Sequence, residues 1–225
     1  MKKAFSAFFL CIVLSGLHPF HVRGDDSLPE ILEGMLERYG NLPAFTVDYQ
    51  REIITRSMAV LGDEMKGDLA SGKIHFKPPH YLRIEQEEPR PETVTTDGHT
   101  IWWYIPEKET VYRYPFDSLG KELMLLGDIF RGLSRVSDSF DVIQSDLGDP
   151  SAYHLNLVPN PPWEEIKSID LVISRDDYNI REIEIQNVLG NITRFILGVL
   201  MVREDLDSDF FTFEVPEGVR VIEEG

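Results

Sequence analysis

Apolar residues recur at i, i+3 and i+4 spacing between residues 28 and 39, as on one face of an α-helix. Just before this stretch, Ser27 and Glu30 have the Ser-x-x-Glu spacing of a capping box, and Pro29 suits the first helical turn. Gly40 is a suitable residue to end the helix. The pattern predicts one amphipathic helix whose single apolar stripe consists of Leu28, Ile31, Leu32, Met35, Leu36 and Tyr39.

From residue 45 the period of the pattern changes to two, which is typical of β-strands with one buried face. Phe45, Val47 and Tyr49 alternate with polar residues, and Ile74 and Phe76 do the same. Turn signals at residues 97–98, 176–179 and 189–191 separate later segments of this kind. We predict a mainly β (α+β) chain, a meander of about ten antiparallel strands near residues 45–50, 73–77, 82–84, 93–96, 100–105, 112–114, 140–144, 154–158, 166–173, 180–187, 192–197 and 211–215.

The strand predicted at residues 100–105 is apolar on both faces, because it reads Thr-Ile-Trp-Trp-Tyr-Ile and neighbouring strand residues point to opposite sides. One of its faces would meet an internal core. The other would meet helices or an apolar ligand held by a curved sheet. The alternative is that protein packs against both faces, as in an ordinary core.

One segment, residues 118–136, interrupts the meander with apolar residues near helical spacing. Gly120, Gly127 and Gly132 lie within it, and each interior glycine costs a helix about 1 kcal/mol relative to alanine. The segment is therefore predicted to be a weak helix, or two short ones, held mainly by packing. Such a helix suits an element that moves, and it also suits an ordinary crossover helix.

The first 24 residues have the layout of a secretory signal peptide, with Lys2 and Lys3 before an apolar run of about 14 residues. A membrane anchor is the alternative, although the run is shorter than the roughly 20 residues that a spanning helix needs. Cys11 is the single cysteine and lies in this run, so we expect no disulfide and no lipid anchor in the rest of the chain. Residues 25–225 are predicted to form a single domain.

The net charge of the chain is −17, and it becomes −20 without the first 24 residues, which hold three basic residues and no acidic one. Such a surface repels nucleic acid and anionic membrane, and it suits either solubility alone or a meeting with a basic partner.

No nucleophile elbow, glycine-rich phosphate loop or metal-ligand spacing is present in the sequence. His75, His80, His99 and His154 are scattered, and the adjacent acidic pairs point to opposite faces or lie in turns. We therefore expect a protein that is not an enzyme and that uses no cofactor and no metal.

The order of several short motifs resembles the periplasmic outer-membrane lipoprotein carrier family, LolA. The motifs are FTVDYQ (residues 45–50), GKIHFKPPHYLR (72–83), TDGHTIWWYIP (96–106), LNLVP (155–159), GNITRF (190–195) and FTFEVPEGV (211–219), together with the predicted N-terminal helix and signal peptide. No single motif is specific to the family, whereas their order and spacing together are.

This resemblance implies an open, incomplete antiparallel β-barrel of about ten or eleven strands, with a helical lid over an apolar cavity. The implied function is to carry acylated lipoproteins through the periplasm from an inner-membrane release complex to an outer-membrane receptor, if one exists. A lipid or glycolipid shuttle, or a lipoprotein sensor, on the same fold is the alternative. We expect a monomer that binds no nucleic acid, with cavity or lid residues Phe45, Val47, Tyr49, Ile74, Phe76, Trp102, Trp103, Tyr104, Leu123, Leu126, Ile129, Phe130 and Leu133.

The resemblance fails at one position. The family often has Arg-Pro where this chain has Pro78-Pro79, and that arginine is associated with holding the lid. Pro78 cannot take this role, so Lys77, Arg83 and Arg51 are the candidates to replace it.

Overall fold

The computed structural model describes residues 26–61, 67–116, 121–145 and 148–224, so the expected signal peptide lies outside the described residues. Its helices are α1 (Leu28–Tyr39), α2 (Arg56–Leu61) and α4 (Lys121–Ile129), with short 3-10 helices η1 (Pro106–Lys108), η2 (Val136–Asp138) and η3 (Asp209–Phe211). Its strands are β1 (Phe45–Ile54), β2 (Asp68–Lys77), β3 (Tyr81–Glu88), β4 (Glu92–Thr96), β5 (Thr100–Ile105), β6 (Thr110–Pro115), β7 (Phe140–Ser145), β8 (Ala152–Pro159), β9 (Ile166–Ser174), β10 (Ile180–Asn187), β11 (Ile192–Leu197), β12 (Met201–Val202) and β13 (Arg220–Glu223).

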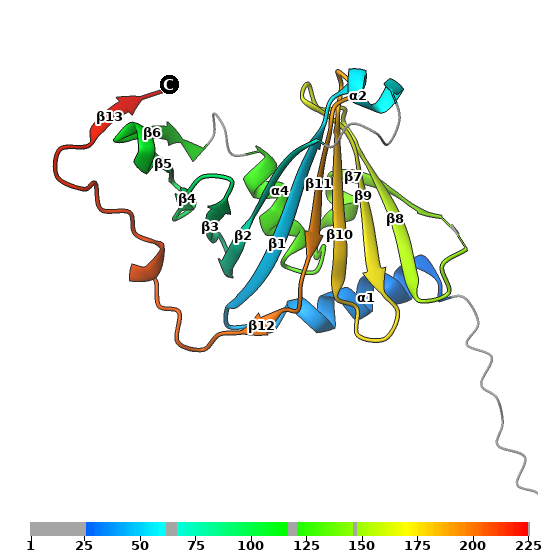
Figure 1. The fold of residues 1–225 in the computed structure, drawn as a ribbon. Helices are drawn as coiled ribbons and strands as arrows, with labels where there is room; N and C mark the ends of the chain where they lie inside the picture. Colours follow the sequence, from blue (N-terminus) through cyan, green and yellow to red (C-terminus); the bar gives the residue numbers. More distant parts are fainter. Residues whose placement is uncertain (1–25, 62–66, 117–120, 146–147, 225) are drawn as a thin grey trace, which may run out of the picture.

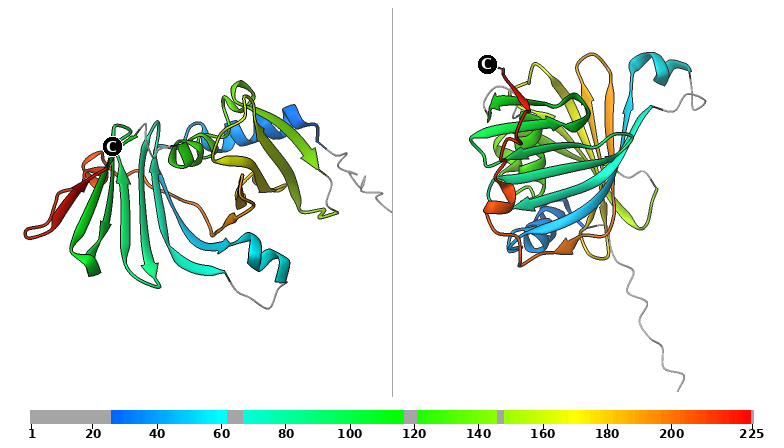
Figure 2. Two further views of the ribbon diagram at one scale, coloured as in Figure 1. Left: turned by 90° about the horizontal axis from the view of Figure 1, so that it is seen from above. Right: turned by 60° about the vertical axis from the view of Figure 1, so that its left-hand side comes forward.

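All of these strands belong to one open, curved sheet, which has α1 and α4 on its inner side (Figures 1 and 2). The strand order is β13-β6-β5-β4-β3-β2-β1-β11-β10-β9-β8-β7, and β12 pairs with the start of β1. Neighbouring strands are antiparallel, except that β13 runs parallel to β6. The prediction of a mainly β, open antiparallel sheet is confirmed, and the sheet has 13 strands within the described residues.

The structure corrects one predicted strand and adds short elements that were not predicted. Residues 211–215 are not a strand, because Phe211 ends η3 and residues 212–215 pair with no neighbouring strand. The last strand is β13 instead, which the sequence pattern did not predict because its four residues carry little alternation. The short elements α2 and β12 were also not predicted.

The predicted N-terminal helix is confirmed as α1, including its capping box. The backbone N–H of Ser27 donates to the Glu30 carboxylate at 2.7 Å, and this bond lowers the pKa of Glu30. At the other end, the Tyr39 hydroxyl accepts a hydrogen bond from the Ile180 N–H at 3.0 Å. Burial raises the pKa of Tyr39 to about 12. The bond between Tyr39 and Ile180 ties the end of α1 to the start of β10.

The weak helix predicted at residues 118–136 is two short helices with a turn between them. Residues 118–120 lie outside the described residues, and α4 ends at Ile129. Gly132 and Leu133 then adopt positive φ angles of 74° and 56°, which α-helices do not contain, and η2 follows. Gly132 is required at its position, because a Cβ there would lie 2.5 Å from the Met35 carbonyl oxygen.

The main core lies between the inner face of the sheet and the two helices. The strand register places Phe45 opposite Phe76 and Val47 opposite Ile74, so these side chains share one face. Phe130, which follows α4, meets the rings of Phe45 and Phe76 at centroid distances of 5.2 and 5.8 Å. This aromatic cluster joins α4 to the centre of the sheet.

The outer face of β2–β6 is covered by the segment between β12 and β13, residues 203–219, which we call the strap. Figure 1 shows it running along the edge of the sheet from β12 to β13. The ring of Phe213 in the strap lies 5.7 Å from that of Trp102 and 5.6 Å from that of Tyr104. The face of β5 that carries Trp102 and Tyr104 therefore packs against the strap, whereas Trp103 on the other face is only half-buried.

Candidate functional site

The inner face of β3–β6 carries apolar side chains that extend the core toward solvent. Register aligns Ile84 on β3 with Val94 on β4, Trp103 on β5 and Tyr112 on β6. The rings of Trp103 and Tyr112 lie 5.5 Å apart. These residues are only half-buried, unlike the fully buried core beside them. We call this surface the inner belt, and it consists of Ile84, Val94, Trp103, Tyr112 and Tyr114.

Polar side chains gather at the end of the inner belt that lies near the end of β1. The Trp103 indole N–H donates to the Glu92 carboxylate at 3.0 Å, and Arg51 donates to the Gln86 side-chain oxygen at 3.2 Å. Burial raises the pKa of Tyr49, and the charge of Arg51 opposes that rise. The inner belt is therefore apolar along most of its length and polar at one end.

A cavity of about 200 Å³ lies between α4 and the inner face of the sheet. Ligand pockets typically measure 300–1,000 Å³, so this volume is too small for a long apolar chain. Enlarging it requires α4 to move away from the sheet, which makes α4 a candidate lid. The cavity is lined by Phe76, Pro79, His80, Leu82, Thr96, Phe116, Gly127, Asp128 and Arg131.

The position of Gly127 in α4 contributes to this cavity. A Cβ built on Gly127 would have Phe76 as its nearest neighbour, at an ordinary contact distance of 3.8 Å. The glycine is therefore not required by a close approach or by its backbone angles. It lowers the helical propensity of α4 without a structural need at this position.

One arginine ties the end of α4 to the sheet. Arg131 donates from Nη1 to the Pro79 carbonyl oxygen at 3.2 Å, and its Nη2 forms an ion pair with Asp128. The link therefore runs from the helical side to the turn between β2 and β3. Its acceptor is a backbone oxygen, which every residue type in the turn would supply.

None of the three arginine or lysine side chains predicted to hold the lid makes this contact. Lys77 donates to the Leu206 carbonyl oxygen at 2.8 Å, and Arg83 donates to that of Phe210 at 3.0 Å, so both bind the strap. Arg51 binds Gln86. The prediction that one of these three side chains replaces the family's arginine is therefore corrected. Arg131 instead provides the contact with the turn that contains Pro78 and Pro79.

The structure brings most of the predicted cavity residues to one face. Phe45, Val47, Tyr49, Ile74 and Phe76 lie on the inner face of β1 and β2, and Leu126, Ile129, Phe130 and Leu133 pack against them. Leu123 lies in α4, but its side chain is outside the described residues. Trp103 lies on the inner belt. Trp102 and Tyr104 are the exceptions, because they lie against Phe213 on the outer face and are corrected accordingly.

Sequence reasoning missed Ile84, Val94 and Tyr112 as members of the inner belt. Their alternation was visible, but the pattern did not reveal which face of each strand lies inside. It also missed Arg131, whose partner is a backbone oxygen about fifty residues away and leaves no mark in the sequence.

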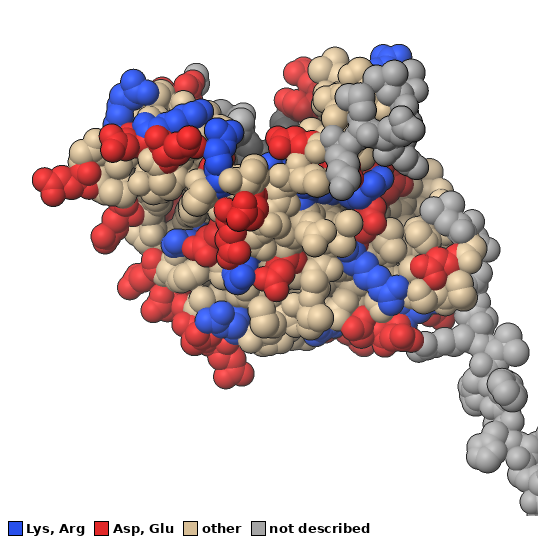
Figure 3. Space-filling model, viewed as in Figure 1, with Lys and Arg blue, Asp and Glu red and all other residues tan. Residues whose placement is uncertain are grey.

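The outer face of the sheet carries charges of both signs, interspersed rather than separated (Figure 3). Lys73 lies between Asp48 and Glu87 at 3.2 and 3.3 Å, and Arg194 lies 3.0 Å from Glu184. The excess of acidic residues is thus partly compensated on this face.

Two other kinds of site are not found in the described part of the chain. No group of three or more His, Cys, Asp or Glu side chains there is placed to hold a metal ion. No helix in the same residues has both the length and the apolar character needed to cross a membrane.

Comparison with known proteins places this chain in a family. Residues 60–214 match the family model described as outer membrane lipoprotein carrier protein LolA. A relative from Azotobacter vinelandii, named outer-membrane lipoprotein carrier protein, is 25% identical over 157 residues, which cover 68% of this chain and 72% of that protein. A relative of the same name from Chromohalobacter salexigens is 24% identical over 196 residues, covering 87% of each chain.

The fold is also similar to that of a solved structure, an uncharacterised conserved protein from Thermus thermophilus. The TM-score is 0.51 at 12% sequence identity, and the match covers 88% of this chain and 100% of the other. This likeness supports the open-sheet fold, and the family match covers well over half of the chain. The chain therefore belongs to the LolA outer-membrane lipoprotein carrier family.

Proposed function

We propose that this protein carries acylated lipoproteins, holding their acyl chains on the inner belt beneath α4. The observation that carries the proposal is the half-buried apolar belt of β3–β6, which continues directly from the core to the cavity under α4. Family membership and the names of the relatives support it. A carrier of this kind needs binding and release but no turnover, so we infer that the protein is not an enzyme.

The energetics of acyl chains set limits on such a carrier. Each methylene kept from water contributes about 0.8 kcal/mol, so three chains of about 15 methylenes would cost roughly 36 kcal/mol to hold in water. Full burial at that value would exceed the practical ceiling on affinity, which is roughly 20 kcal/mol, and release would not occur. The carrier must therefore cover the acyl chains incompletely, or part of the binding free energy must offset the cost of moving its lid.

The α4 region has the properties that this limit requires. The helix is short, contains Gly127 and is linked to the sheet by one arginine to a backbone oxygen. The cavity beneath it, of about 200 Å³, is smaller than a typical ligand pocket. Loading would exchange the contacts between α4 and the sheet for contacts between cargo and the inner belt.

We further infer where and with which partners the carrier works. It would act in the periplasm as a monomer, as a single domain over residues 25–225. It would take cargo from an inner-membrane lipoprotein release complex and pass it to an outer-membrane receptor. The expected signal peptide and the family match support this assignment.

The decisive experiment identifies the ligand of the protein purified from its native envelope. Mass spectrometry of the extracted ligand should find an acylated peptide, and a fluorescent acyl probe should compete with it. A free glycolipid would favour the shuttle alternative instead.

A matched pair of variants tests the location of the site. Trp103→Ala should weaken probe binding about tenfold, since it removes the largest ring of the inner belt, whereas Trp102→Ala on the outer face should leave the binding constant unchanged. Equal effects of the two substitutions would count against the inner belt as the site.

A further inference from the structure

Arg51 lies on the inner face of the sheet, at the polar end of the inner belt. It follows the buried Tyr49 by two residues on β1, so both side chains point to the same side. Its guanidinium donates to the side-chain oxygen of Gln86 on β3 at 3.2 Å. Between them lies Gly72 of β2, which pairs with both Tyr49 and Gln86 and has no side chain. The Arg51 side chain therefore reaches across β2 toward the first strand of the belt.

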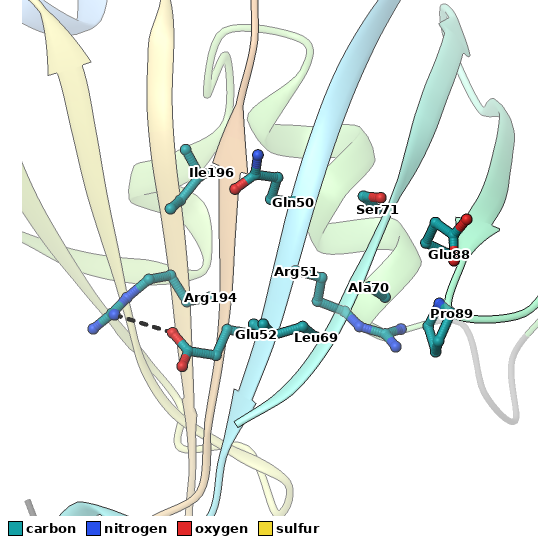
Figure 4. A pocket seen from close by; sticks show the side chains of 10 residues that line it. All are labelled: Gln50, Arg51, Glu52, Leu69, Ala70, Ser71, Glu88, Pro89, Arg194 and Ile196. Carbon is teal, nitrogen blue, oxygen red and sulfur yellow. Dashed lines mark hydrogen bonds and ion pairs between the residues drawn. The ribbon is translucent and has the colours of Figure 1, made fainter. Parts of the chain in front are cut away.

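The charge of this guanidinium is not compensated by a carboxylate in the described part of the chain. Its acceptor there is the neutral amide oxygen of Gln86, and its enclosed Nε has none. Arg194 is the opposite case, because Glu184 lies 3.0 Å and Glu52 3.5 Å from it. Figure 4 shows the difference, since Arg194 is joined to Glu52 whereas the Arg51 side chain extends away from both.

A half-buried guanidinium without a counter-ion is electrostatically incomplete. Arginine stays protonated in proteins, so its charge cannot be removed by a shift in pKa. Taking a charge out of water is unfavourable unless an opposite charge or sufficient hydrogen bonds replace the water. A ligand that brings an oxyanion to Arg51 would supply the missing partner.

The other polar groups at this end of the belt already have partners. The Gln86 amide N–H donates to the Arg90 carbonyl oxygen at 2.9 Å, which turns the amide oxygen of Gln86 toward Arg51. The Glu92 carboxylate accepts the Trp103 indole N–H at 3.0 Å. The group left to recognise a ligand is therefore the positively charged guanidinium.

We propose that the inner belt prefers acyl ligands whose head group carries an oxyanion, a phosphate or a carboxylate, and that Arg51 binds this head group. The acyl chain would lie against Ile84, Val94 and Trp103, which are aligned across β3, β4 and β5. The inference rests on the proposed acyl-binding function and adds the chemistry of the head group. It makes anionic lipids competitors of the lipoprotein cargo.

The net charge of the molecule predicts the opposite preference. Residues 25–225 carry a net charge of −20, and the field of such a surface repels anions. Tighter binding of anionic ligands must therefore come from a local positive group, and Arg51 is placed to supply it.

Four probes separate the head group from the chain: decanoate, decyl phosphate, decanol and inorganic phosphate. Displacement of a fluorescent acyl probe gives each affinity, and the NMR signal of the Arg51 Nε–H reports contact with the guanidinium. Decanoate or decyl phosphate should bind at least about tenfold more tightly than decanol, because charge-assisted hydrogen bonds add to the same apolar contact. The tighter of the two identifies the head group. Equal affinities for all three amphiphiles overturn the proposal, and so does inorganic phosphate that binds as tightly as decyl phosphate.

Decanol distinguishes failure of this inference from failure of the proposed function. If decanol binding depends on Trp103 and the anions bind no more tightly, the acyl site stands and the head-group preference is wrong. If no amphiphile displaces the acyl probe, the inner belt is not an acyl site and both are wrong.

Substitutions then assign the charge. Arg51→Gln should remove the preference for the anionic probes while leaving the affinity for decanol unchanged. Arg90→Gln is the matched control, because the Arg90 side chain is 62% exposed and pairs with Glu107 at 3.6 Å. This control removes the same charge nearby and should keep the preference. A preference that survives Arg51→Gln contradicts the assignment.

A second variant keeps the test informative if Arg51→Gln does not fold. The charges of Arg51 and Glu92 both act on the Tyr49 hydroxyl, so they lie at the same end of the belt. Glu92→Gln removes the negative charge, while the glutamine oxygen can still accept the Trp103 N–H. The ratio of decanoate to decanol affinity should rise severalfold. An unchanged ratio counts against an anion-binding end.

Discussion

Gly127 in α4 can be replaced by a larger residue without a clash, whereas Gly132 just after the helix cannot. The two glycines are therefore a matched pair for mutation. Gly127 has space for a methyl group, whereas Gly132 has a positive φ of 74° and a close backbone neighbour. Gly127→Ala should therefore raise the free energy of unfolding by roughly 1 kcal/mol, and Gly132→Ala should lower it. Thermal or denaturant unfolding measures both changes.

The same Gly127→Ala variant tests whether α4 moves. If cargo loading requires α4 to leave the sheet, a more stable helix should slow the exchange of a fluorescent acyl probe. A stabilised variant with an unchanged exchange rate would make α4 a static part of the core.

Arg131 is the second residue whose replacement distinguishes a lid from a fixed helix. Arg131→Gln removes the ion pair with Asp128 and the donor to the Pro79 carbonyl oxygen, at a stability cost of about 1 kcal/mol. Probe exchange should accelerate about fivefold, because this free energy no longer holds α4 to the sheet. Arg135→Gln is the control, since its ion pair with Asp138 lies in the same region but is highly exposed. Equal exchange rates in the two variants would exclude the link as a determinant of opening.

At the scale of elements, the strap stabilises the outer face of the sheet without contributing to the inner belt. Phe213→Ala removes the ring that covers Trp102 and Tyr104, and should lower the free energy of unfolding by about 2 kcal/mol. Binding of an acyl probe should be unchanged in the folded variant. Val215→Ala, at an exposed position of the strap, should change neither quantity. Loss of probe binding in Phe213→Ala would mean that the outer aromatic residues belong to the site after all.

The elements differ in how far their sequences predicted them, and the reason is the environment of each. β10 and β11 were predicted to the residue, because alternation and flanking turns agree there. Phe211, Phe213 and Val215 also alternate, but their segment packs as a strap and makes no ladder. Alternation therefore detects a segment with one buried side, and pairing depends on a neighbour that lies elsewhere in the chain.

The candidate site was predictable in composition but not in orientation. Trp102 and Trp103 are adjacent and equally apolar, so the pattern places them on opposite faces without saying which face is inside. Arg131 was not predictable, since its contact with Pro79 depends on how α4 lies over the β2–β3 turn.

For the whole molecule, the charge balance predicts how cargo transfer depends on salt. Residues 25–225 carry a net charge of −20, which should attract a basic partner surface over a distance that salt screens to about 8 Å at physiological ionic strength. The association rate with the accepting partner should fall about tenfold as salt is raised, while the affinity for the acyl probe stays constant. Stopped-flow transfer measurements at several salt concentrations test this. A salt-independent rate would leave solubility as the role of the charge.

The pairing of β1 with β11 has a consequence for when the fold can be completed. Tyr49 pairs with Leu197, so the two strands at the middle of the sheet are separated by 148 residues of sequence (197 − 49), about three quarters of the domain. During synthesis, β1 and β2 can form their hairpin early, but the other edge of β1 stays open until β11 has been made. An open edge of this kind is a site for pairing with other chains. A nascent or truncated chain that ends before residue 192 therefore exposes the centre of its own sheet, and it depends on chaperones or on rapid completion to avoid aggregation.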